Sequence, residues 1–284
     1  MKSLTRQANS IFKKDHLVYI EGHRGMNRVY YENTLKSFAK AIECGIDSIE
    51  FDVWLTKDKV PVIFHGGDLG EVSHNFKVED KTLLVNNTTF EEMRKLEFLK
   101  DSEQKIPTLA EVLDLCKDKI FLNIEIKDSQ VEETFNIVIK LLEERKMLHQ
   151  IDISSFVHDY HKQIVKYNKE HEEQIEFGYL YYDQKDKEFI PYKFENRGTT
   201  MNVYQKDVNK ELVDKAHENG MPVMVWFKFD DSEDEKDYER ILNLGIDCLC
   251  CNKPDLAMKY RDNVFYKKNR VELLYIIYLF KLFS

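Results

Sequence analysis

Short apolar runs alternate with helical patterns along almost the whole chain, and this alternation limits the possible folds more than any other feature of the sequence. The apolar runs, typical of buried strands, begin at Leu17, Ser48, Val60, Ile120, Ile151, Ile175, Thr199, Pro222 and Ile246. The helical patterns cover residues 33–44, 89–98, 108–116, 130–147, 156–172, 207–219, 235–243 and 254–261. If one run is miscounted, about eight strand–helix units remain, which predicts a parallel α/β sheet closed into a (β/α)8 barrel. An open doubly wound sheet is the alternative.

A chain of 284 residues, 43% of them hydrophobic, is long enough to bury one large core, so we expect a single domain over residues 1–284. Two polar segments, 66–106 and 182–198, are too long for ordinary loops, and we interpret them as a small insertion and a loop at the barrel rim. Residues 271–283 form an apolar tail that is too short to span a bilayer. We expect a final helix packed on the body of the protein, with peripheral membrane contact or docking to a partner as the alternative.

Charge and cysteine content exclude several functional classes. The net charge of −9, without a basic stripe, argues against nucleic-acid binding. The first 16 residues lack the apolar centre of a secretory signal, and no transmembrane span is evident, which favours a cytoplasmic location. The five cysteines fit reduced thiols of that compartment. Three of them, Cys248, Cys250 and Cys251, are interpreted as core residues rather than zinc ligands, because their spacing differs from that of zinc ligand pairs.

Carboxylates are placed at the ends of several apolar runs. Glu50 and Asp52 stand two apart on one predicted strand, so their side chains point to the same face. Glu125 and Lys127 have the same spacing on another strand. Neighbouring carboxylates repel one another unless they share a cation, and oxygen ligands without cysteine suit Mg²⁺ or Ca²⁺. The pattern predicts a divalent metal site, with surface ion pairs at the strand ends as the alternative.

Two histidines and two basic residues also stand at predicted strand ends. Near a divalent cation, His23 and His65 can act as general acid and general base, because imidazole titrates near neutral pH. Arg24 and Lys127 supply positive charge in an acidic protein, as a bound phosphate requires. Together these residues indicate phosphoryl transfer.

These residues belong to short motifs in a characteristic order. The motifs are His23-Arg24-Gly25, Glu32-Asn33-Thr34, Gly45-Ile46-Asp47-Ser48-Ile49-Glu50-Phe51-Asp52-Val53, Leu55-Thr56-Lys57-Asp58, Pro61-Val62 with His65, Asn123-Ile124-Glu125-Ile126-Lys127 and Asn252-Lys253-Pro254-Asp255. In these motifs the chain resembles the glycerophosphodiester phosphodiesterases over nearly its whole length. The resemblance implies a TIM barrel with a small insertion after the third strand. It also implies metal-dependent hydrolysis of a glycerophosphodiester to sn-glycerol 3-phosphate and an alcohol, a reaction of lipid and glycerol metabolism.

The resemblance further implies roles for individual residues. The implied metal ligands are Glu50, Asp52 and Glu125, and the implied acid–base pair is His23 and His65. The implied substrate-binding residues are Arg24 and Lys127 for the phosphate, Glu32 for orientation of the site, and Trp226 as a pocket wall. Core packing is the alternative for Trp226. Glu21, on the same strand face as His23, is a weaker candidate for a supporting residue.

The chain departs from the family pattern after His65, where an aspartate usually follows and this sequence has Gly66-Gly67-Asp68. Either the orientation of His65 differs here, or Asp68 reaches it through the two flexible glycines. Two other functions remain open, namely lysophospholipase D-type hydrolysis of lysophospholipids and a catalytically silent barrel that binds a phosphorylated ligand. The expected partner is a small glycerophosphodiester or lysolipid substrate.

Overall fold

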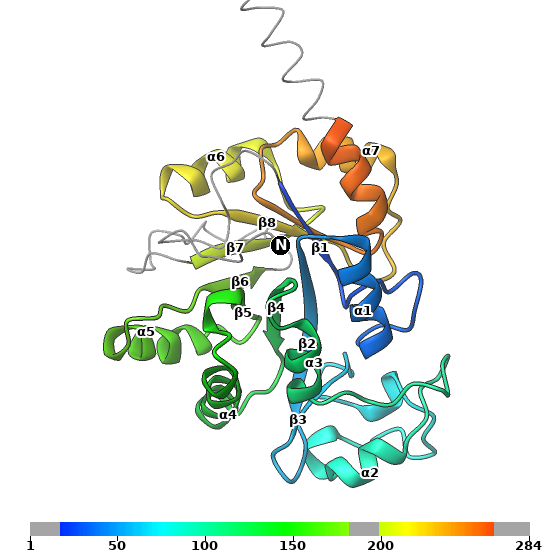
Figure 1. Cartoon of the computed structure of the whole chain (residues 1–284). Coiled ribbons are helices and arrows are strands. Elements are labelled where there is room, and N and C mark those ends of the chain that lie inside the picture. The colour runs from blue at the N-terminus through cyan, green and yellow to red at the C-terminus, as the bar shows by residue number, and fades with distance from the viewer. Residues whose placement is uncertain (1–17, 182–198, 264–284) are drawn as a thin grey trace, which may run out of the picture.

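A computed structural model describes residues 18–181 and 199–263 of the chain (Figure 1). Three predictions fall outside these residues and are not tested by the structure. They concern the amino-terminal segment 1–16, the rim loop 182–198 and the apolar tail 271–283.

Nine strands form one sheet, and all of them except β3 form a closed parallel barrel (Figure 1). The barrel strands are β1 (Tyr19–Gly22), β2 (Ser48–Leu55), β4 (Phe121–Ile126), β5 (Ile151–Ser155), β6 (Phe177–Tyr181), β7 (Thr199–Tyr204), β8 (Val223–Trp226) and β9 (Cys248–Cys251). Because β1 pairs in parallel with both β2 and β9, the ring is closed. The predicted (β/α)8 barrel is therefore confirmed, and the open sheet is wrong.

The apolar run that begins at Val60 is the one that does not belong to the barrel. It forms β3 (Pro61–Ile63), which pairs antiparallel with β2, with Leu55 opposite Pro61. A tight turn joins the two strands, in which Thr56 N donates to Val60 O at 3.0 Å. So short a connection permits only an antiparallel pair, because a parallel crossover needs a dozen or so residues.

Helices form the outer layer of the barrel (Figure 1). They are α1 (Leu35–Cys44), α3 (Leu109–Cys116), α4 (Val131–Arg145), α5 (Tyr160–Glu170), α6 (Lys210–Glu218), α7 (Glu235–Leu242) and a helical segment over 254–263. Several begin where the sequence offers a cap; Thr108 and Glu111, for example, form a capping box at the start of α3. Among residues 18–181 and 199–263, no helix is both long and apolar enough to cross a bilayer.

The segment between β3 and α3 lies at the edge of the barrel (Figure 1). Together with side chains of β2 and β3 it forms a second, smaller hydrophobic cluster. It contains α2 (Phe90–Lys95) and two short 3-10 helices, Val72–His74 and Val85–Asn87. The buried side chains of this cluster are Trp54, Val62, Phe64, Val72, Phe76, Val85, Met93, Phe98 and Ile106. The predicted insertion at 66–106 coincides with this segment.

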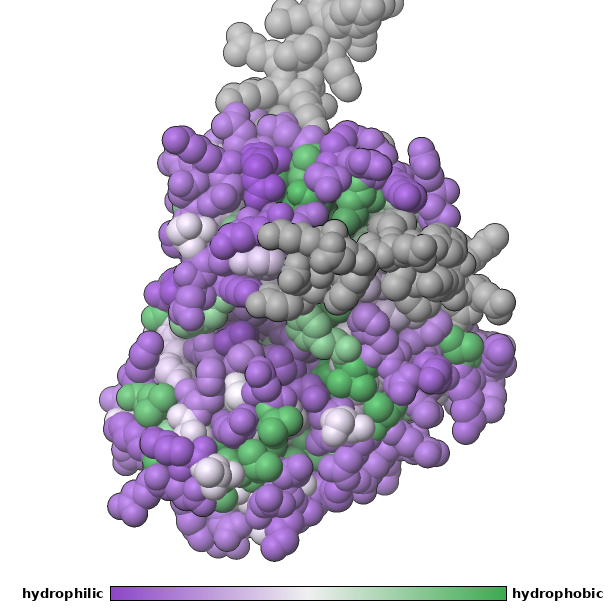
Figure 2. Space-filling view, turned by 180° about the vertical axis from the view of Figure 1, so that it is seen from behind, coloured by the Kyte–Doolittle hydropathy of each residue, from purple (hydrophilic) through white to green (hydrophobic). Residues whose placement is uncertain are grey.

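Figure 2 shows the opposite face of the molecule, where hydrophobic residues form scattered patches among hydrophilic ones.

The main core fixes which strand residues face inward and which face the helices. On β2, Phe51 packs outward against Phe38 of α1, with 5.6 Å between ring centroids. The alternation of a strand then turns its neighbours Glu50 and Asp52 to the other face. Parallel pairing places Asp52 of β2 opposite Glu125 of β4. The fold thus brings acidic side chains from two strands to one place.

Candidate active site

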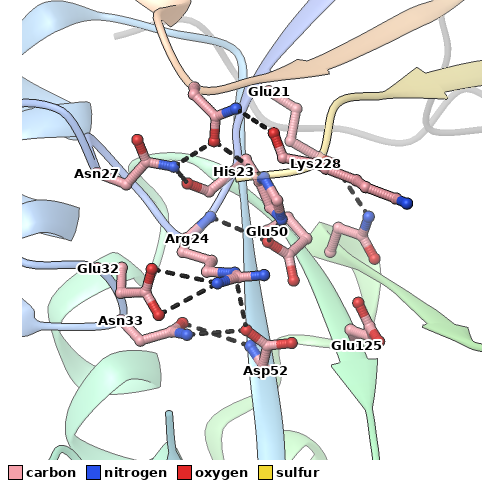
Figure 3. A network of polar contacts seen from close by, with 12 residues as sticks. Glu21, His23, Arg24, Asn27, Glu32, Asn33, Glu50, Asp52, Glu125 and Lys228 are labelled. Carbon is pink, nitrogen blue, oxygen red and sulfur yellow. Dashed lines mark hydrogen bonds and ion pairs between the residues drawn. The ribbon is translucent and has the colours of Figure 1, made fainter. Parts of the chain in front are cut away.

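Glu50 and Asp52, in the middle of β2, form an acidic cluster with Glu125 near the carboxyl end of β4 (Figure 3). Each contributes a carboxylate oxygen, and these oxygens all lie within 4.8 Å of one another. The three residues are 4%, 1% and 8% exposed, respectively. Such burial contradicts the alternative of surface ion pairs.

The electrostatics of the acidic cluster favour a bound cation. Burial and the charges of Asp52 and Glu125 raise the pKa of Glu50 well above its usual value. Burial likewise raises the pKa of Glu125, against the influence of Lys127. The Oε1 atom of Glu50 is buried and has no hydrogen-bond partner among the described residues. A divalent cation would relieve the repulsion and use this oxygen, so the acidic cluster fits the metal implied by the resemblance.

Arg24 lies against the cluster in a tightly bonded position (Figure 3). Its Nη1 atom donates to both oxygens of Glu32 at 3.1 Å, and its Nε lies 3.4 Å from Asp52 Oδ2. Its backbone N–H donates to Glu50 Oε2 at 2.9 Å. Burial would lower the pKa of Arg24, but Glu32 and Asp52 raise it, so the guanidinium is charged. Glu32 therefore orients Arg24 directly.

Lys127 is the second cation of the site. Its Nζ atom lies 2.9 Å from Glu125 Oε1 and 3.6 Å from Asp52 Oδ1. Burial acts to lower the pKa of Lys127, but the charges of Glu125 and Asp52 outweigh it and raise the pKa. Two permanent positive charges thus flank the acidic cluster.

The two predicted histidines lie on the wall of one large cavity, next to the acidic cluster. His23 follows β1, and its Nε2 atom is 3.9 Å from Glu50 Oε2. His65 follows β3, where its backbone oxygen accepts a hydrogen bond from Trp54 Nε1 at 3.0 Å. Burial and the charge of Arg24 lower the pKa of His23 to about 3 and that of His65 to about 2. Both imidazoles are therefore neutral at pH 7.

The cavity has a volume of about 1130 Å³ and contains most of the residues singled out from the sequence. Those on its wall are His23, Arg24, Glu32, Glu50, His65, Glu125, Lys127 and Trp226. The ring of Trp226 packs between Phe156 and Tyr204, with centroid distances of 5.8 and 5.1 Å. Trp226 thus packs against other aromatic rings and also faces the cavity.

Glu21 of β1 lies opposite Ser48, two residues before Glu50 on the neighbouring strand. Its carboxylate accepts hydrogen bonds from Ser48 Oγ at 2.6 Å and from Asn123 Nδ2 at 3.0 Å. Glu21 does not line the cavity, whereas Asn123 does. Glu21 therefore contacts the cavity wall by its hydrogen bond with Asn123, and among the described residues no hydrogen bond joins its carboxylate to His23.

The turn after His65 contradicts one of the two alternatives, that Asp68 reaches the histidine. Gly66 adopts φ 68°, and its N–H donates to Asn75 Oδ1 at 2.8 Å. Asp68 is exposed and lines the cavity, but no hydrogen bond among the described residues joins it to His65, whose Nδ1 has no partner. Asp68 therefore does not take the place of the usual aspartate.

Sequence reasoning missed three asparagines that support the site. Asn33 and Asn252 stand inside the family motifs, and this position is the sequence signal for their role. Asn33 Nδ2 donates to Asp52 Oδ2 at 2.8 Å, and Asn252 Oδ1 lies 3.1 Å from His23 Nδ1. Asn75 lies in the insertion and has no sequence signal. Its Nδ2 donates to Glu32 Oε1 at 3.0 Å, so it connects Glu32 with the turn after His65.

Comparison with known proteins places the chain among phosphodiesterases. The model of the glycerophosphoryl diester phosphodiesterase family matches residues 23–256. A glycerophosphodiester phosphodiesterase of Caldanaerobacter subterraneus subsp. tengcongensis is 31% identical over 245 residues, which cover 82% of this chain and 93% of the relative. A glycerophosphodiester phosphodiesterase from Bacillus altitudinis is 29% identical over 266 residues, which cover 86% of this chain and 98% of the relative.

A solved structure has the same fold. The glycerophosphodiester phosphodiesterase of Thermotoga maritima superimposes with a TM-score of 0.67 at 27% identity, covering 85% of this chain and 97% of that one. Together with the buried acidic cluster and the confirmed barrel, these matches establish the enzyme class expected from the motifs. The chain therefore belongs to the glycerophosphoryl diester phosphodiesterase family and is a hydrolase of glycerophosphodiesters.

Proposed function

We propose that this chain hydrolyses glycerophosphodiesters to sn-glycerol 3-phosphate and an alcohol at the cavity above the acidic cluster, with Mg²⁺ or Ca²⁺ as the cofactor. The main support is the convergence of three carboxylates within 4.8 Å, next to two fixed cations and two neutral histidines. A phosphodiesterase from Oleispira antarctica, which shares the fold at 23% identity and a TM-score of 0.71, was solved in complex with sn-glycerol-3-phosphate. The same product is expected here.

Glu50, Asp52 and Glu125 would hold the cation through carboxylate oxygens, the ligands that Mg²⁺ and Ca²⁺ prefer. When bound, the cation supplies positive charge that polarises the phosphate and offsets the negative charge growing on its oxygens. Arg24 and Lys127 bind non-bridging phosphate oxygens from either flank and strengthen this stabilisation. Glu32 keeps the Arg24 guanidinium in a fixed plane.

His23 and His65 exchange protons with the substrate. One imidazole takes a proton from the attacking hydroxyl, and the other gives a proton to the leaving alkoxide. Attack by water would form glycerol 3-phosphate directly, whereas attack by the glycerol 2-hydroxyl would form a cyclic phosphate that water then opens. The proton donor must first be charged, and a bound phosphate anion favours this by raising the pKa of a neighbouring imidazole. Trp226 would form an apolar wall for the alcohol part of the substrate.

A coupled assay for glycerol 3-phosphate tests this function across a panel of diesters, with each metal and with a chelator. His23→Ala and His65→Ala should each lower kcat by about 10²- to 10⁴-fold, the usual contribution of a general acid or base. His149→Ala is the matched control, because His149 lies outside the cavity. Near-normal turnover by either folded variant would refute the assignment. Metal binding without release of glycerol phosphate from any diester would instead indicate the silent binding barrel.

A lysophospholipase D-type activity is the second candidate, and it is supported by apolar side chains at the cavity. Phe156 and Leu99 line the cavity although they are 44% and 42% exposed. Exposed apolar side chains there would suit the acyl chain of a lysolipid. This activity predicts faster turnover of lysophosphatidylcholine than of glycerophosphocholine, and a loss of that preference in Phe156→Ala.

The cytoplasmic location, the single domain and membrane contact through the apolar tail stay predictions.

A further inference from the structure

Asn252, directly after β9, has its amide group oriented by partners that can only accept hydrogen bonds. Its Nδ2 donates to Lys228 O at 2.9 Å and to the carboxylate of Glu233. Its backbone N–H donates to the same carboxylate at 2.9 and 3.0 Å. A carbonyl and a carboxylate offer no proton, so the NH₂ end of Asn252 must face them and its Oδ1 must face the other way.

The opposite end of Asn252 faces His23. The Oδ1 atom lies 3.1 Å from His23 Nδ1 and accepts a hydrogen bond from Asn27 Nδ2 at 2.6 Å. Asn27 Nδ2 also donates to the backbone oxygen of His23 at 2.8 Å, which fixes the orientation of this second amide (Figure 3). Two separate sets of contacts therefore agree that Asn252 presents an acceptor to His23 Nδ1.

We propose that Glu233, acting through Asn252, keeps His23 protonated at Nδ1, so that Nε2 is the only ring atom that takes up or releases a proton. An unprotonated Nδ1 would bring its lone pair against the lone pairs of Asn252 Oδ1, and both residues are buried. Nε2 lies 3.9 Å from Glu50 Oε2, on the side of the acidic cluster. Glu233 is thus a positioning residue, as the carboxylate of a catalytic triad is for its histidine.

The carboxylate of Glu233 is itself well supported. Tyr238 OH donates to Glu233 Oε2 at 2.6 Å, and Lys253 Nζ donates to the backbone oxygen of Glu233 at 2.8 Å. Glu233 is 4% exposed and Asn252 is 1% exposed. The contrast with His65 is clear, because its Nδ1 has no hydrogen-bond partner among the described residues. Only one of the two histidines therefore has a tautomer set by the protein.

The decisive experiment measures the imidazole nitrogens of His23 by long-range ¹H–¹⁵N correlation at neutral pH, with the signals assigned from His23→Gln. The wild-type protein should show a protonated Nδ1 and an unprotonated Nε2. In Glu233→Gln the neutral amide holds the NH₂ of Asn252 less strongly and can itself donate to Asn252. Part of the Asn252 side chains should therefore turn, against the remaining contacts with Lys228 O and Asn27 Nδ2, and a substantial Nε2–H population of His23 should appear. Glu239→Gln, an exposed glutamate on α7, is the matched control and should leave both signals unchanged.

The kinetic consequence rests on the proposed role of His23. In Glu233→Gln we expect kcat to fall by at least about 10-fold, since a correctly protonated general acid or base contributes about 10²- to 10⁴-fold. The KM for the diester should change little, because Glu233 does not line the cavity. Tyr238→Phe keeps the carboxylate and should keep the Nδ1–H tautomer.

Three outcomes separate this inference from the proposed function. An Nε2–H signal for His23 in the wild-type protein would overturn the inference without any variant. An unchanged tautomer in folded Glu233→Gln would also overturn it. A shifted tautomer with unchanged kcat would support the positioning by Glu233 but refute the proposed acid–base role of His23.

Discussion

Asn33 contacts Asp52 through both ends of its amide group. Its Nδ2 donates to Asp52 Oδ2 at 2.8 Å, and its Oδ1 accepts from the backbone N–H of Asp52 at 3.4 Å. Asn33 is fully buried and adopts φ 56°, a left-handed conformation that asparagine tolerates better than most residues. The loop after β1 thereby fixes the orientation of a proposed metal ligand on β2.

Removal of the Asn33 side chain should weaken cation binding. Asn33→Gly keeps the left-handed backbone accessible, so the variant isolates the loss of both hydrogen bonds from backbone strain. We expect the Kd for Mg²⁺ or Ca²⁺ to rise by about 10- to 100-fold, the usual cost of losing a residue that orients a metal ligand. Titration calorimetry measures this, with Asn86→Gly at an exposed position as the control. An unchanged Kd in a folded Asn33→Gly variant would show that cation binding by Asp52 does not depend on its hydrogen bonds with Asn33.

Introducing the aspartate that usually follows the second histidine should harm this protein. Gly66 has φ 68°, and a Cβ atom there would lie 3.2 Å from Gly70 Cα and 3.3 Å from Trp54 Nε1. Gly66→Asp should therefore lower the free energy of unfolding by more than the roughly 1–2 kcal/mol of a left-handed non-glycine residue. The substitution should also displace the turn that directly follows His65, and a displaced His65 should lower kcat.

The matched control for this change is Gly45→Asp. Gly45 has nearly the same φ, 70°, but a Cβ atom there would meet no heavy atom of the described residues within 4 Å. Denaturant titrations of the two variants separate the cost of the backbone conformation from that of crowding. Equal losses of stability, or a higher kcat in Gly66→Asp, would contradict the structure.

The barrel could be predicted from the sequence because each of its strands is an apolar run separated from the next by a helix or a long segment. Periodicity alone could not distinguish β3, because a buried parallel strand and a short antiparallel one are both apolar. The distance from Leu55 to Pro61 held the missing signal, since it is too short for a parallel crossover. Connection length therefore corrects a strand count that composition leaves ambiguous.

The gathering of the ionisable residues at the candidate site could be predicted because a barrel brings the carboxyl ends of its strands to one face. Side-chain alternation then placed Glu50 and Asp52 together, and the register of β2 and β4 brought in Glu125. Asn75 was not predictable in this way. Its position depends on the irregular path of the insertion, which has no period that relates Asn75 to Glu32 or to Gly66.

Glu50→Gln should stabilise the metal-free protein while removing its response to metal. A buried carboxyl whose pKa is raised costs folding free energy above its unfolded pKa, and glutamine removes that charge while still accepting from Arg24 N–H. We expect the Tm without metal to rise by about 2–4 °C, which corresponds to about 1 kcal/mol in a chain of this size. Thermal unfolding by circular dichroism measures the change, with exposed Glu79→Gln as the control.

Added cation distinguishes the two proteins further. At about 100 times its Kd, a divalent cation should stabilise the wild-type protein by about 2.7 kcal/mol. Glu50→Gln should show little of this stabilisation. A metal-free Tm below that of the wild type, or an equal response to metal, would mean that the acidic cluster is not a repulsive site relieved by a cation.

The ion pair of His217 and Asp247, which lies outside the cavity, should make a pH-dependent contribution to the stability of the fold. His217 Nε2 lies 2.7 Å from Asp247 Oδ2, and this hydrogen bond, with the charge of Asp247, raises the pKa of His217 above its usual value near 6.5. A raised histidine pKa stabilises the fold fully below the unfolded pKa, and this stabilisation is lost as pH rises through the folded pKa. Since the two side chains are 38% and 31% exposed, solvent limits the effect to about 0.5 kcal/mol.

His217→Gln should therefore be less stable than the wild type below about pH 6 and nearly as stable above pH ~8, given the usual histidine pKa. Denaturant midpoints measured between these limits give the difference, which should shrink as pH rises. Asp247→Asn is the matched control, because it keeps an acceptor for Val223 N–H but removes the charge, and it should abolish the same pH dependence. A difference that stays constant over this range, or grows with pH, would show that His217 does not gain its proton affinity from Asp247.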